Sequence, residues 1–256
     1  PLGISEAQAE ALKKEHLPAD LEMVYCNTPP KDDAEKAARA KDAQLVMLAN
    51  MPFKENVLQE LPEAKFLSVA FTGVDHVAMD YCKAHGIVVS NCSGYANEAV
   101  SELVIGLALG LYRRMLPADE AVRTGKTRAG LLGIELSGKK FGVVGAGAIG
   151  RRTIALAQAF GCDVYYYNRS QTQIDGAKSV SLDELMEISD IISLHVPLMA
   201  ETKGLIGAAE IAKMKKTAIL INTARGPVVD SQALADALKE GRIAGAGIDV
   251  FEGEPP

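Results

Sequence analysis

A glycine-rich loop is the clearest chemical signal in the sequence. Residues 145–150 read Gly-Ala-Gly-Ala-Ile-Gly and lie between an apolar run, 141–144, and a helical pattern. In this context the first glycine permits a tight turn, the second lets the backbone approach a pyrophosphate, and the third allows close helix packing. The amino end of the helix offers free N–H groups and partial positive charge to phosphate. A turn that merely favours glycine is the alternative. We expect a nicotinamide dinucleotide to bind Gly145, Gly147, Ala148, Ile149 and Gly150.

The residues after the next apolar run, 164–167, bear on which dinucleotide is bound. They are Asn168, Arg169 and Ser170. A site for NAD usually has Asp or Glu here, where a carboxylate accepts hydrogen bonds from the ribose hydroxyls. A guanidinium instead suits a 2′-phosphate, which it binds through charge-assisted, bidentate hydrogen bonds. The sequence therefore favours NADP over NAD, with NAD still possible if Arg169 is only a solvated surface residue.

Two later apolar runs also end in residues that could do chemistry. His195 ends the run 191–195, and Arg225 follows the run 218–222. In open parallel sheets, ligands bind in the crevice outside the carboxyl ends of the strands. Arg225 could bind a carboxylate with its planar fork, or it could cap a surface loop. Position alone leaves both interpretations open.

Apolar runs alternate with helical patterns along almost the whole chain. Strands buried on both faces are typical of parallel sheets covered by crossover helices. This order predicts an α/β protein with two doubly wound parallel-sheet domains. The long helical stretch 97–115 and the polar stretch 123–138 separate two groups of strands, so we expect domains at 1–94 and 95–256. The expected strands are 21–25, 45–48, 66–70, 87–90, 141–144, 164–167, 191–195, 218–222 and 245–250.

Composition excludes several classes of partner. The net charge is −6 and no long run of one sign occurs, whereas a nucleic-acid surface needs a basic stripe. The 4 cysteines are scattered and form no CxxC pair, which predicts reduced thiols in a cytoplasmic protein without a metal site. The longest apolar run, 103–112, is about half a membrane span, so we expect a buried helix and no membrane partner.

Ordered motifs over nearly the whole chain closely resemble the D-isomer-specific 2-hydroxyacid dehydrogenases. The resemblance implies a Rossmann cofactor domain and a flavodoxin-like substrate domain. It also implies an oxidoreductase that transfers hydride between nicotinamide and the carbonyl carbon of a small 2-oxoacid. The motifs are Phe71–Asp75, Asn91–Tyr95, Ala99–Glu102, Gly145–Gly150, Leu194–Leu198, Glu201–Thr202, Asn222–Gly226 and Gly247–Pro255.

The same resemblance implies a role for particular residues. Arg225 would hold the substrate carboxylate and carbonyl, and Gly226 would let the backbone turn sharply beside the ligand. Glu254 would pair with a catalytic histidine and favour its protonated form. The backbone of Thr72, Gly73 and Val74 would receive the substrate carboxylate, and Asp249 would bind the nicotinamide carboxamide. Further cofactor contacts would come from His195, Val196, Pro197, Thr202, Thr223, Ala224 and Arg225.

The catalytic histidine is the main departure from the family pattern. The family places this acid/base residue beyond the position of Pro256, and His16, His76, His85 and His195 all precede that point. His195 matches the family's cofactor-side histidine. The family's opening strand and its terminal return segment also fall outside this sequence, so the substrate domain is expected to be incomplete at both chain ends.

Several interpretations of function within and beyond the family stay open. Asn168-Arg169-Ser170 favours the glyoxylate/hydroxypyruvate reductases that use NADPH. A phosphoglycerate dehydrogenase-like enzyme would need extra basic residues on the first domain, and no such cluster is visible. A non-catalytic, corepressor-like dinucleotide sensor is the alternative from another class. We also expect a homodimer, with helix 100–111 and the segment after it as a candidate interface, although that helix could equally be an intradomain core element.

Overall fold

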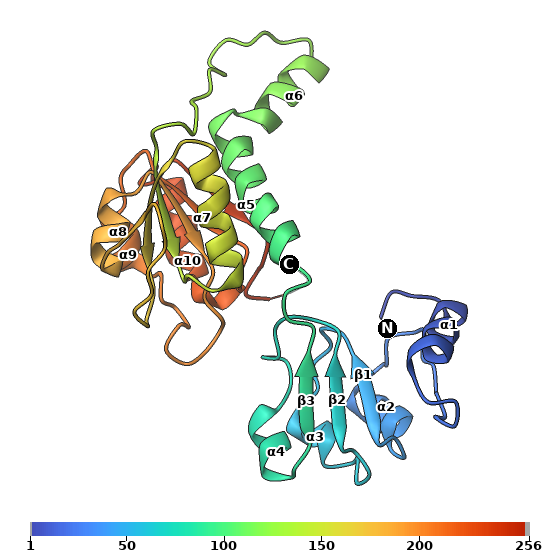
Figure 1. Ribbon diagram of the computed structural model, residues 1–256. Coiled ribbons are helices and arrows are strands. Elements are labelled where there is room, and N and C mark those ends of the chain that lie inside the picture. Colours follow the sequence, from blue (N-terminus) through green and yellow to red (C-terminus); the bar gives the residue numbers. More distant parts are fainter. Residues whose placement is uncertain (1, 254–256) are drawn as a thin grey trace. The chain divides into compact units, whose positions relative to one another are not determined.

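The computed structural model describes residues 2–253, and the chain divides into two compact units. The first unit is Pro1–Tyr95 and the second is Ala96–Pro256. Figure 1 shows that each unit contains its own sheet with its own helices.

The first unit is built on a three-stranded parallel sheet. Its strands are β1 (Leu45–Leu48), β2 (Phe66–Val69) and β3 (Val88–Asn91), in the order β1-β2-β3. Its helices are α1 (Glu6–His16), α2 (Asp33–Ala40), α3 (Glu55–Leu58) and α4 (Met79–Ala84). Val57, Leu58, Leu67 and Cys82 form the centre of its core and are at most 1% exposed. The connecting helices thus cover a parallel sheet, as the alternating pattern predicted.

The prediction of a strand at 21–25 is wrong. This segment has no regular secondary structure, and Val24 within it is 75% exposed. A strand needs a neighbouring strand to satisfy its backbone hydrogen bonds, and none pairs with this segment in the described chain. The segment instead contacts the start of the chain, since the Tyr25 hydroxyl donates to the Ile4 carbonyl at 2.5 Å. Helix α1, which buries no residue, was not predicted.

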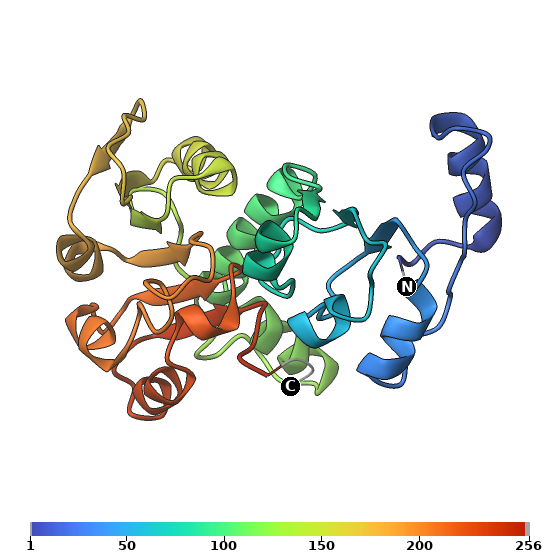
Figure 2. The same ribbon diagram turned by 90° about the horizontal axis from the view of Figure 1, so that it is seen from below.

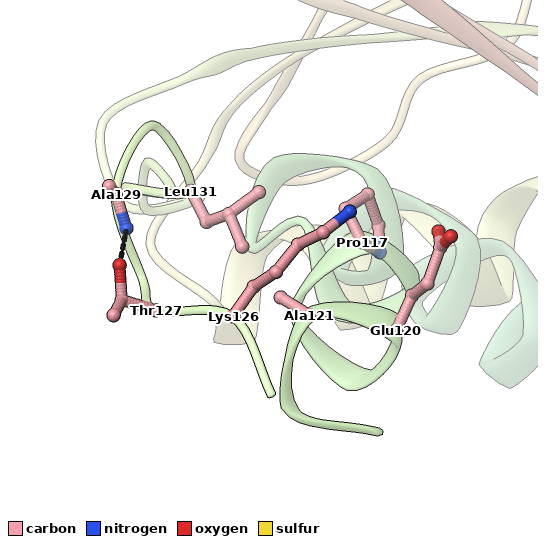
Figure 3. Close-up of a pocket in the computed structure, with 7 residues that line it drawn as sticks. All are labelled: Pro117, Glu120, Ala121, Lys126, Thr127, Ala129 and Leu131. Atoms are coloured by element: carbon pink, nitrogen blue, oxygen red, sulfur yellow. Dashed lines mark hydrogen bonds between the residues drawn. The ribbon is translucent and has the colours of Figure 1, made fainter. Parts of the chain in front are cut away.

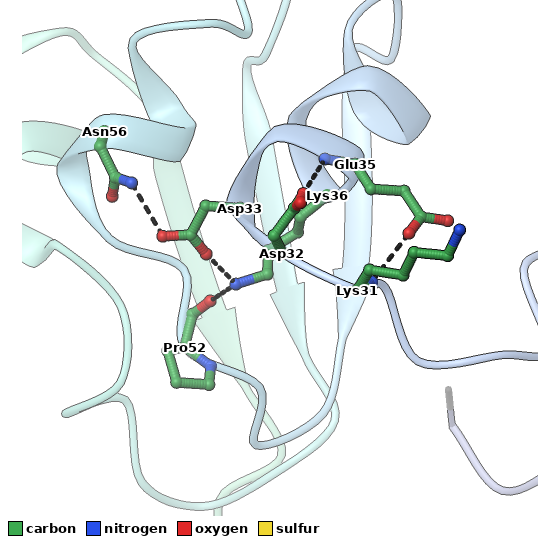
Figure 4. Close-up of polar contacts among 7 residues, drawn as sticks. All are labelled: Lys31, Asp32, Asp33, Glu35, Lys36, Pro52 and Asn56. Carbon is green, nitrogen blue, oxygen red and sulfur yellow. Dashed lines mark hydrogen bonds and ion pairs between the residues drawn. The ribbon is translucent and has the colours of Figure 1, made fainter.

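Polar contacts attach α2 to α3 and to the segment before it. Figure 4 shows the carboxylate of Asp33 accepting hydrogen bonds from Lys36 at 2.6 Å and from Asn56 at 2.8 Å. Lys36 also donates to the Pro52 carbonyl at 2.7 Å. These hydrogen bonds, with that of Lys36 first, lower the pKa of Asp33. The contacts fix the segment that connects β1 to α3. This segment leads out from the carboxyl edge of the sheet.

The second unit has a six-stranded parallel sheet. Its strands are β4 (Lys140–Val144), β5 (Asp163–Tyr167), β6 (Ala177–Ser179), β7 (Ile191–Leu194), β8 (Ile219–Asn222) and β9 (Gly245–Ile248). The order β6-β5-β4-β7-β8-β9 places the first strand of the unit in the middle. This is the strand order 3-2-1-4-5-6 of the Rossmann fold, with the topological switch point between β4 and β7. The short edge strand β6 was not predicted.

Helices cover both faces of this sheet. They are α5 (Asn97–Tyr112), α6 (Met115–Arg123), α7 (Ala148–Ala159), α8 (Leu182–Ile188), α9 (Ala208–Lys213) and α10 (Ser231–Lys239), with a 3₁₀ turn at Gly226–Val228. In Figures 1 and 2, α5 and α7 lie on one side of the strands and α9 and α10 on the other. Alternate residues of a strand point to opposite faces, so Ile191 packs with α5 and α7 while Ile192 packs with α8 and α9.

The expected long helix 97–115 is divided in two. Arg114 adopts a left-handed conformation with φ 51°, so α5 ends and α6 starts in a new direction. Helix α5 packs against α7, and its residues Val104, Ile105 and Ala108 are at most 5% exposed. One face of α5 therefore belongs to the core of the second unit. Helix α6 and the segment after it extend beyond the sheet (Figure 1).

Asp190 connects the start of β7 to its neighbours. Its carboxylate accepts hydrogen bonds from the Lys140 backbone N–H at 2.9 Å and from the Lys215 ammonium at 2.7 Å. Its carbonyl accepts from the Tyr112 hydroxyl at 3.0 Å. Burial acts to raise the pKa of Asp190, but the hydrogen bonds from Lys215 and Lys140 outweigh it and the pKa is lowered. The two strands that flank the switch point are thus fixed at their amino ends.

Candidate dinucleotide-binding site

The cofactor residues expected from the sequence follow the carboxyl ends of five strands of one sheet. The loop 145–150 follows β4, and residues 168–170 follow β5. Residues 195–197, 223–225 and 249 follow β7, β8 and β9 in the same way. Because the strands are all parallel, these segments lie at one edge of the sheet, on both sides of the switch point. Of the expected cofactor residues, Thr202 alone is more distant from a strand end.

The space available for a side chain differs among the three glycines of the loop. Gly145 has φ 99°, and a Cβ there would lie 2.8 Å from the His195 carbonyl oxygen. A Cβ on Gly150 would lie 2.0 Å from the carbonyl oxygen of Gly145. A Cβ on Gly147 would meet no atom within 4 Å. Gly145 and Gly150 are therefore required by the fold itself, whereas Gly147 leaves open space beside the backbone.

The loop presents its backbone at the amino end of α7. The capping residue Gly147 has no side chain to bond the first N–H groups of the helix, which lack intrahelical partners. The earlier N–H groups are already used, since Gly145 donates to the Tyr167 carbonyl at 2.8 Å and Ala146 to Asn168 Oδ1 at 3.0 Å. The unpaired N–H groups and the positive end of the helix dipole therefore both lie at residues 147–150, where an anion is favoured.

A polar hollow of about 520 Å³ lies at the end of β5. Its described lining contains amide, hydroxyl and guanidinium groups and no carboxylate. Arg169 and Ser170 are exposed at this position. In the described part of the chain Arg169 pairs with no carboxylate, so its charge is available to a ligand. The lining residues are Asn168, Arg169, Ser170, Gln171, Thr172, Gln173 and Ser179.

Asn168 connects this hollow to the glycine-rich loop 145–150, the phosphate loop. Its Oδ1 accepts from Ala146, while its Nδ2 donates to the carbonyl and the hydroxyl oxygen of Ser170, both at 3.0 Å. Sequence reasoning assigned Asn168 only a cofactor contact and missed this loop-fixing arrangement. Asn commonly bonds nearby backbone in turns, which was the available signal.

His195 lies against the phosphate loop as a neutral side chain. Its Nε2 is 2.9 Å from Ser193 Oγ, and Ser193 is fully buried. Burial lowers the pKa of His195 to about 4. At neutral pH the ring is therefore uncharged and a poor proton donor.

An Asn-centred turn positions the residues after β8. The side chain of Asn222 accepts from the Ala224 N–H at 3.1 Å and donates to the Arg225 carbonyl at 2.9 Å. Thr223 is 8% exposed, and its hydroxyl is buried without a hydrogen-bond partner. Arg225 is partly exposed, with Nη1 2.7 Å from the Ala224 carbonyl. From the sequence Asn222 was only the first residue of a family motif and had no role of its own, although its turn preference was visible there.

Gly226 has a different role from the sharp turn that we expected. Its φ is not positive, and a Cβ there would lie 2.1 Å from the backbone of Phe251. Glycine is needed because the segment at 251–252 crosses directly over this position. The structure thus brings the described end of the chain to the residue that follows Arg225, while Glu254 itself lies outside the described residues.

Thr202 and Asp249 are two further expected cofactor residues in the second unit. The Thr202 hydroxyl donates to the Pro197 carbonyl at 2.5 Å and accepts from the Met199 N–H at 2.8 Å. Its side chain therefore closes the loop that carries Val196 and Pro197. Asp249 is exposed, and its N–H donates to the Asn222 carbonyl at 3.0 Å. Asp249 thereby lies beside the turn that presents Arg225.

The expected substrate loop lies at the carboxyl edge of the other sheet. Residues 72–74 follow β2, and Asn91 at the end of β3 donates to the Thr72 carbonyl at 2.6 Å. The Thr72 hydroxyl is buried and has no hydrogen-bond partner. This loop therefore belongs to the first unit, whereas Arg225 belongs to the second.

A second hollow, of about 450 Å³, contains none of the expected site residues. Figure 3 shows Pro117, Lys126 and Leu131 lining it on α6 and the segment that follows. Among the described residues no group of three His, Cys, Asp or Glu could hold a metal ion. In that part of the chain no helix is long and apolar enough to cross a membrane.

The fold and the site together define a dinucleotide-binding protein. The open space at Gly147, the free donors at the amino end of α7 and the orphaned hydroxyl of Thr223 all lie at the carboxyl edge of the Rossmann sheet. An anionic diphosphate fits the first two, and a hydrogen-bonding ligand fits the third. The residues present therefore fit a nicotinamide dinucleotide, which supplies hydride chemistry when bound.

Comparison with known proteins defines the family. The sequence model for the D-isomer specific 2-hydroxyacid dehydrogenase, NAD binding domain, matches residues 105–256. The glyoxylate reductase of Thermofilum pendens is 42% identical over 237 residues, which cover 89% of this chain and 70% of that protein. The chain belongs to the D-isomer specific 2-hydroxyacid dehydrogenase family, as the motifs predicted, and is an oxidoreductase with a nicotinamide dinucleotide cofactor.

Two further proteins are similar to this chain over most of its length. The D-3-phosphoglycerate dehydrogenase of Methanocaldococcus jannaschii is 37% identical over 229 residues, covering 87% of this chain and 44% of that protein. The solved structure titled "Acyclic imino acid reductase (Bsp5) in complex with NADPH and D-Arg" is similar, with a TM-score of 0.90 at 30% identity. That match covers 99% of this chain and 81% of the other.

Proposed function

We propose that the protein is an NADPH-preferring reductase of glyoxylate or hydroxypyruvate, or catalyses the reverse oxidation. The observation that carries this proposal is the polar hollow at the end of β5, which contains Arg169 and the hydroxyl side chains of Ser170, Thr172 and Ser179 but no carboxylate. A carboxylate would favour free ribose hydroxyls and repel a phosphate, and a guanidinium does the opposite. The relatives named glyoxylate reductase and the NADPH complex support the same choice.

Arg225 is the residue that would bind and polarise the substrate. Its guanidinium is partly exposed at the carboxyl edge of the sheet, and the Asn222 turn fixes its backbone. A permanently charged fork can hold a carboxylate and also withdraw electron density from an adjacent carbonyl. Backbone N–H groups of residues 72–74 would also donate hydrogen bonds to the substrate carboxylate.

The remaining residues would hold the cofactor or keep a catalytic histidine protonated. Thr223 would donate its orphaned hydroxyl to the cofactor, and Asp249 would bind the nicotinamide carboxamide. Glu254 would keep a catalytic histidine protonated, since a neighbouring anion favours imidazolium. His195 would pack beside the cofactor as a neutral ring, because its pKa is about 4.

A phosphoglycerate dehydrogenase-like activity is the rival within the family. Its substrate carries a phosphate in addition to the carboxylate, so the first unit would need basic side chains near the substrate loop. The segments that follow β1, β2 and β3, residues 49–52, 70–74 and 92–95, contain no Lys or Arg. Lys36 and Lys54, which lie near this edge, already have partners: Lys36 pairs with Asp33, and Lys54 donates to the Asp75 carbonyl at 3.2 Å.

The test is a steady-state assay of the full-length protein with glyoxylate, hydroxypyruvate and 3-phosphohydroxypyruvate, each with NADPH and NADH. We expect the highest kcat/KM for NADPH with one of the two unphosphorylated acids. Arg169→Gln should raise the KM for NADPH about 10-fold or more and leave that for NADH nearly unchanged, because only NADPH carries the 2′-phosphate. Arg225→Gln should lower kcat/KM about 10- to 100-fold while cofactor binding is retained.

Three outcomes would contradict the proposal. A preference for the phosphorylated acid would favour the phosphoglycerate dehydrogenase-like alternative. Tight cofactor binding without turnover of any small 2-oxoacid would favour the corepressor-like sensor. Equal effects of Arg169→Gln on both cofactors would remove the argument for NADP.

We also propose that the protein is a homodimer in the cytoplasm. Helix α6 and the segment after it present large apolar side chains to solvent, among them Leu116 and Leu132, each 81% exposed. An apolar surface of this kind is typical of an interface between copies. Helix α5 contributes one face to the core of its own unit, so the interface would depend mainly on α6 and the following segment.

A further inference from the structure

Arg151 links the phosphate loop to the hollow at the end of β5. It is the first residue after the loop 145–150, is exposed on α7, and its Nη2 donates a hydrogen bond to Thr172 Oγ1. Thr172 is one of the residues that line the hollow. The guanidinium of Arg151 therefore lies at the border of the hollow, although its backbone belongs to a different element.

The partner of Arg151 is itself held in place. The Thr172 carbonyl accepts a hydrogen bond from the Tyr166 hydroxyl at 2.5 Å, and Tyr166 on β5 is 2% exposed. The buried tyrosine thus anchors the backbone of Thr172 to the sheet. Arg151 is consequently hydrogen-bonded to a residue whose backbone is held in place, which reduces the conformational entropy that a ligand would have to remove.

The charge of Arg151 is not neutralised within the described part of the protein. Its partner is a neutral hydroxyl, whereas the adjacent Arg152 pairs with Glu98 at 2.7 Å. Among the described residues neither Arg151 nor Arg169 forms an ion pair with a carboxylate, and the hollow has no acidic lining residue. Two uncompensated guanidinium groups beside hydroxyl side chains form a site for a dianion, and a phosphate monoester is the group that such forks bind.

We propose that Arg151 is a second specificity-determining residue for NADPH, which binds the 2′-phosphate from the α7 side while Arg169 binds it from the β5 side. This inference rests on the proposed preference for NADPH. Thr172 would then share its hydroxyl between Arg151 and a phosphate oxygen. No sequence pattern indicates this role, because the residue after a glycine-rich loop points outward from the helix and its direction depends on the fold.

The experiment compares Arg151→Gln with two matched variants, Arg152→Gln and Arg169→Gln, in the full-length protein. Dissociation constants for NADPH, NADH, adenosine 2′-monophosphate and adenosine 5′-monophosphate are measured by fluorescence or calorimetric titration. We expect Arg151→Gln to weaken NADPH and adenosine 2′-monophosphate about 10-fold, with NADH and adenosine 5′-monophosphate changed less than about twofold. Arg152→Gln should leave the ratio of NADPH to NADH affinity unchanged, and Arg151→Lys should retain part of the NADPH affinity.

The outcomes separate this inference from the proposed function. If Arg169→Gln weakens NADPH selectively and Arg151→Gln does not, the role of Arg151 is wrong and the preference for NADPH stands. If the unmodified protein binds NADH more tightly, the preference for NADPH itself is wrong. Equal weakening of both dinucleotides by Arg151→Gln would also overturn the inference, because it would indicate a role at the diphosphate. Unchanged thermal unfolding of each variant confirms that the fold is retained.

Discussion

His195 illustrates how a side chain with catalytic chemistry can be restricted by its surroundings. Its ring is bonded to the buried Ser193, and its backbone fills the space beside Gly145. Burial lowers its pKa to about 4, whereas an exposed histidine titrates near 6.5. A neutral imidazole here packs against the phosphate loop and is a poor proton donor near neutral pH.

This pKa predicts a specific pH dependence of stability. The unfolded chain takes up a proton at His195 near pH 6.5 and the folded protein near pH 4, so protonation favours unfolding between these values. The contribution to stability is complete above pH 6.5 and is lost as the pH falls toward 4. In His195→Gln, which keeps a side chain able to bond Ser193, the free energy of unfolding should fall less between pH 7 and pH 5.

Urea unfolding at pH 7 and pH 5 measures this difference, and His85→Gln is the matched control because His85 is an exposed histidine in the first unit. An equal fall in stability in the unmodified protein and in His195→Gln would show that His195 is not buried in its neutral form.

The phosphate loop shows what an element requires of its residues. The turn from β4 to α7 brings the Gly150 backbone against Gly145, so that no Cβ fits between them. At Gly147 the same turn leaves open space. All three positions are glycine, so only the space around each one separates a glycine that the fold requires from a glycine that leaves room for a ligand.

Two alanine substitutions test this distinction. Gly150→Ala should lower the free energy of unfolding by about 2 kcal/mol or more, because the new Cβ overlaps the Gly145 carbonyl and forces the helix away from the strand. Gly147→Ala should change stability by less than about 1 kcal/mol but weaken dinucleotide binding at least about 10-fold. Denaturant unfolding and cofactor titration measure the two effects. If Gly147→Ala were the less stable variant, this assignment of the glycines would be wrong.

At the scale of the whole molecule, the most exposed apolar surface lies on α6 and the segment that follows. This segment returns to α5 where Ile134 donates to the Tyr112 carbonyl at 2.9 Å, and a Cβ on Gly133 would lie 2.7 Å from Arg113. The segment is thus fixed at its base while Leu116 and Leu132 stay exposed. Burial of these side chains by a second copy would provide about 25 cal/mol per Å² of apolar surface.

Leu116→Glu should therefore shift the protein from dimer to monomer without unfolding it. A charge placed in an apolar interface costs several kcal/mol, so the dissociation constant of the dimer should rise about 100-fold or more. Sedimentation analysis at several concentrations measures this change. Val24→Glu is the matched control, since Val24 is 75% exposed in the first unit. A monomeric unmodified protein, or equal effects of both variants, would contradict the homodimer proposal.

Much of the fold was predictable from sequence because its causes are local. The β4 and β5 strands, the glycine loop and the helix after it each follow from apolar runs, glycine spacing and helix periodicity. The order of strands in the second unit is consistent with the right-handed crossover rule once these elements are known. The prediction for segment 21–25 failed because its β-favouring residues pair with no strand of the described sheet, and pairing is a property of the tertiary structure.

The candidate site was predictable in type but not in arrangement. The sequence by itself determined that a dinucleotide loop, a carboxylate-free strand end and Arg225 occur in the order of a 2-hydroxyacid dehydrogenase. Only the tertiary structure decided that Asn168 bonds Ala146, that Gly226 admits the chain at Phe251, and that Arg151 reaches Thr172. These contacts join residues distant in the chain, and their distances depend on how strands and helices pack, which no local pattern encodes.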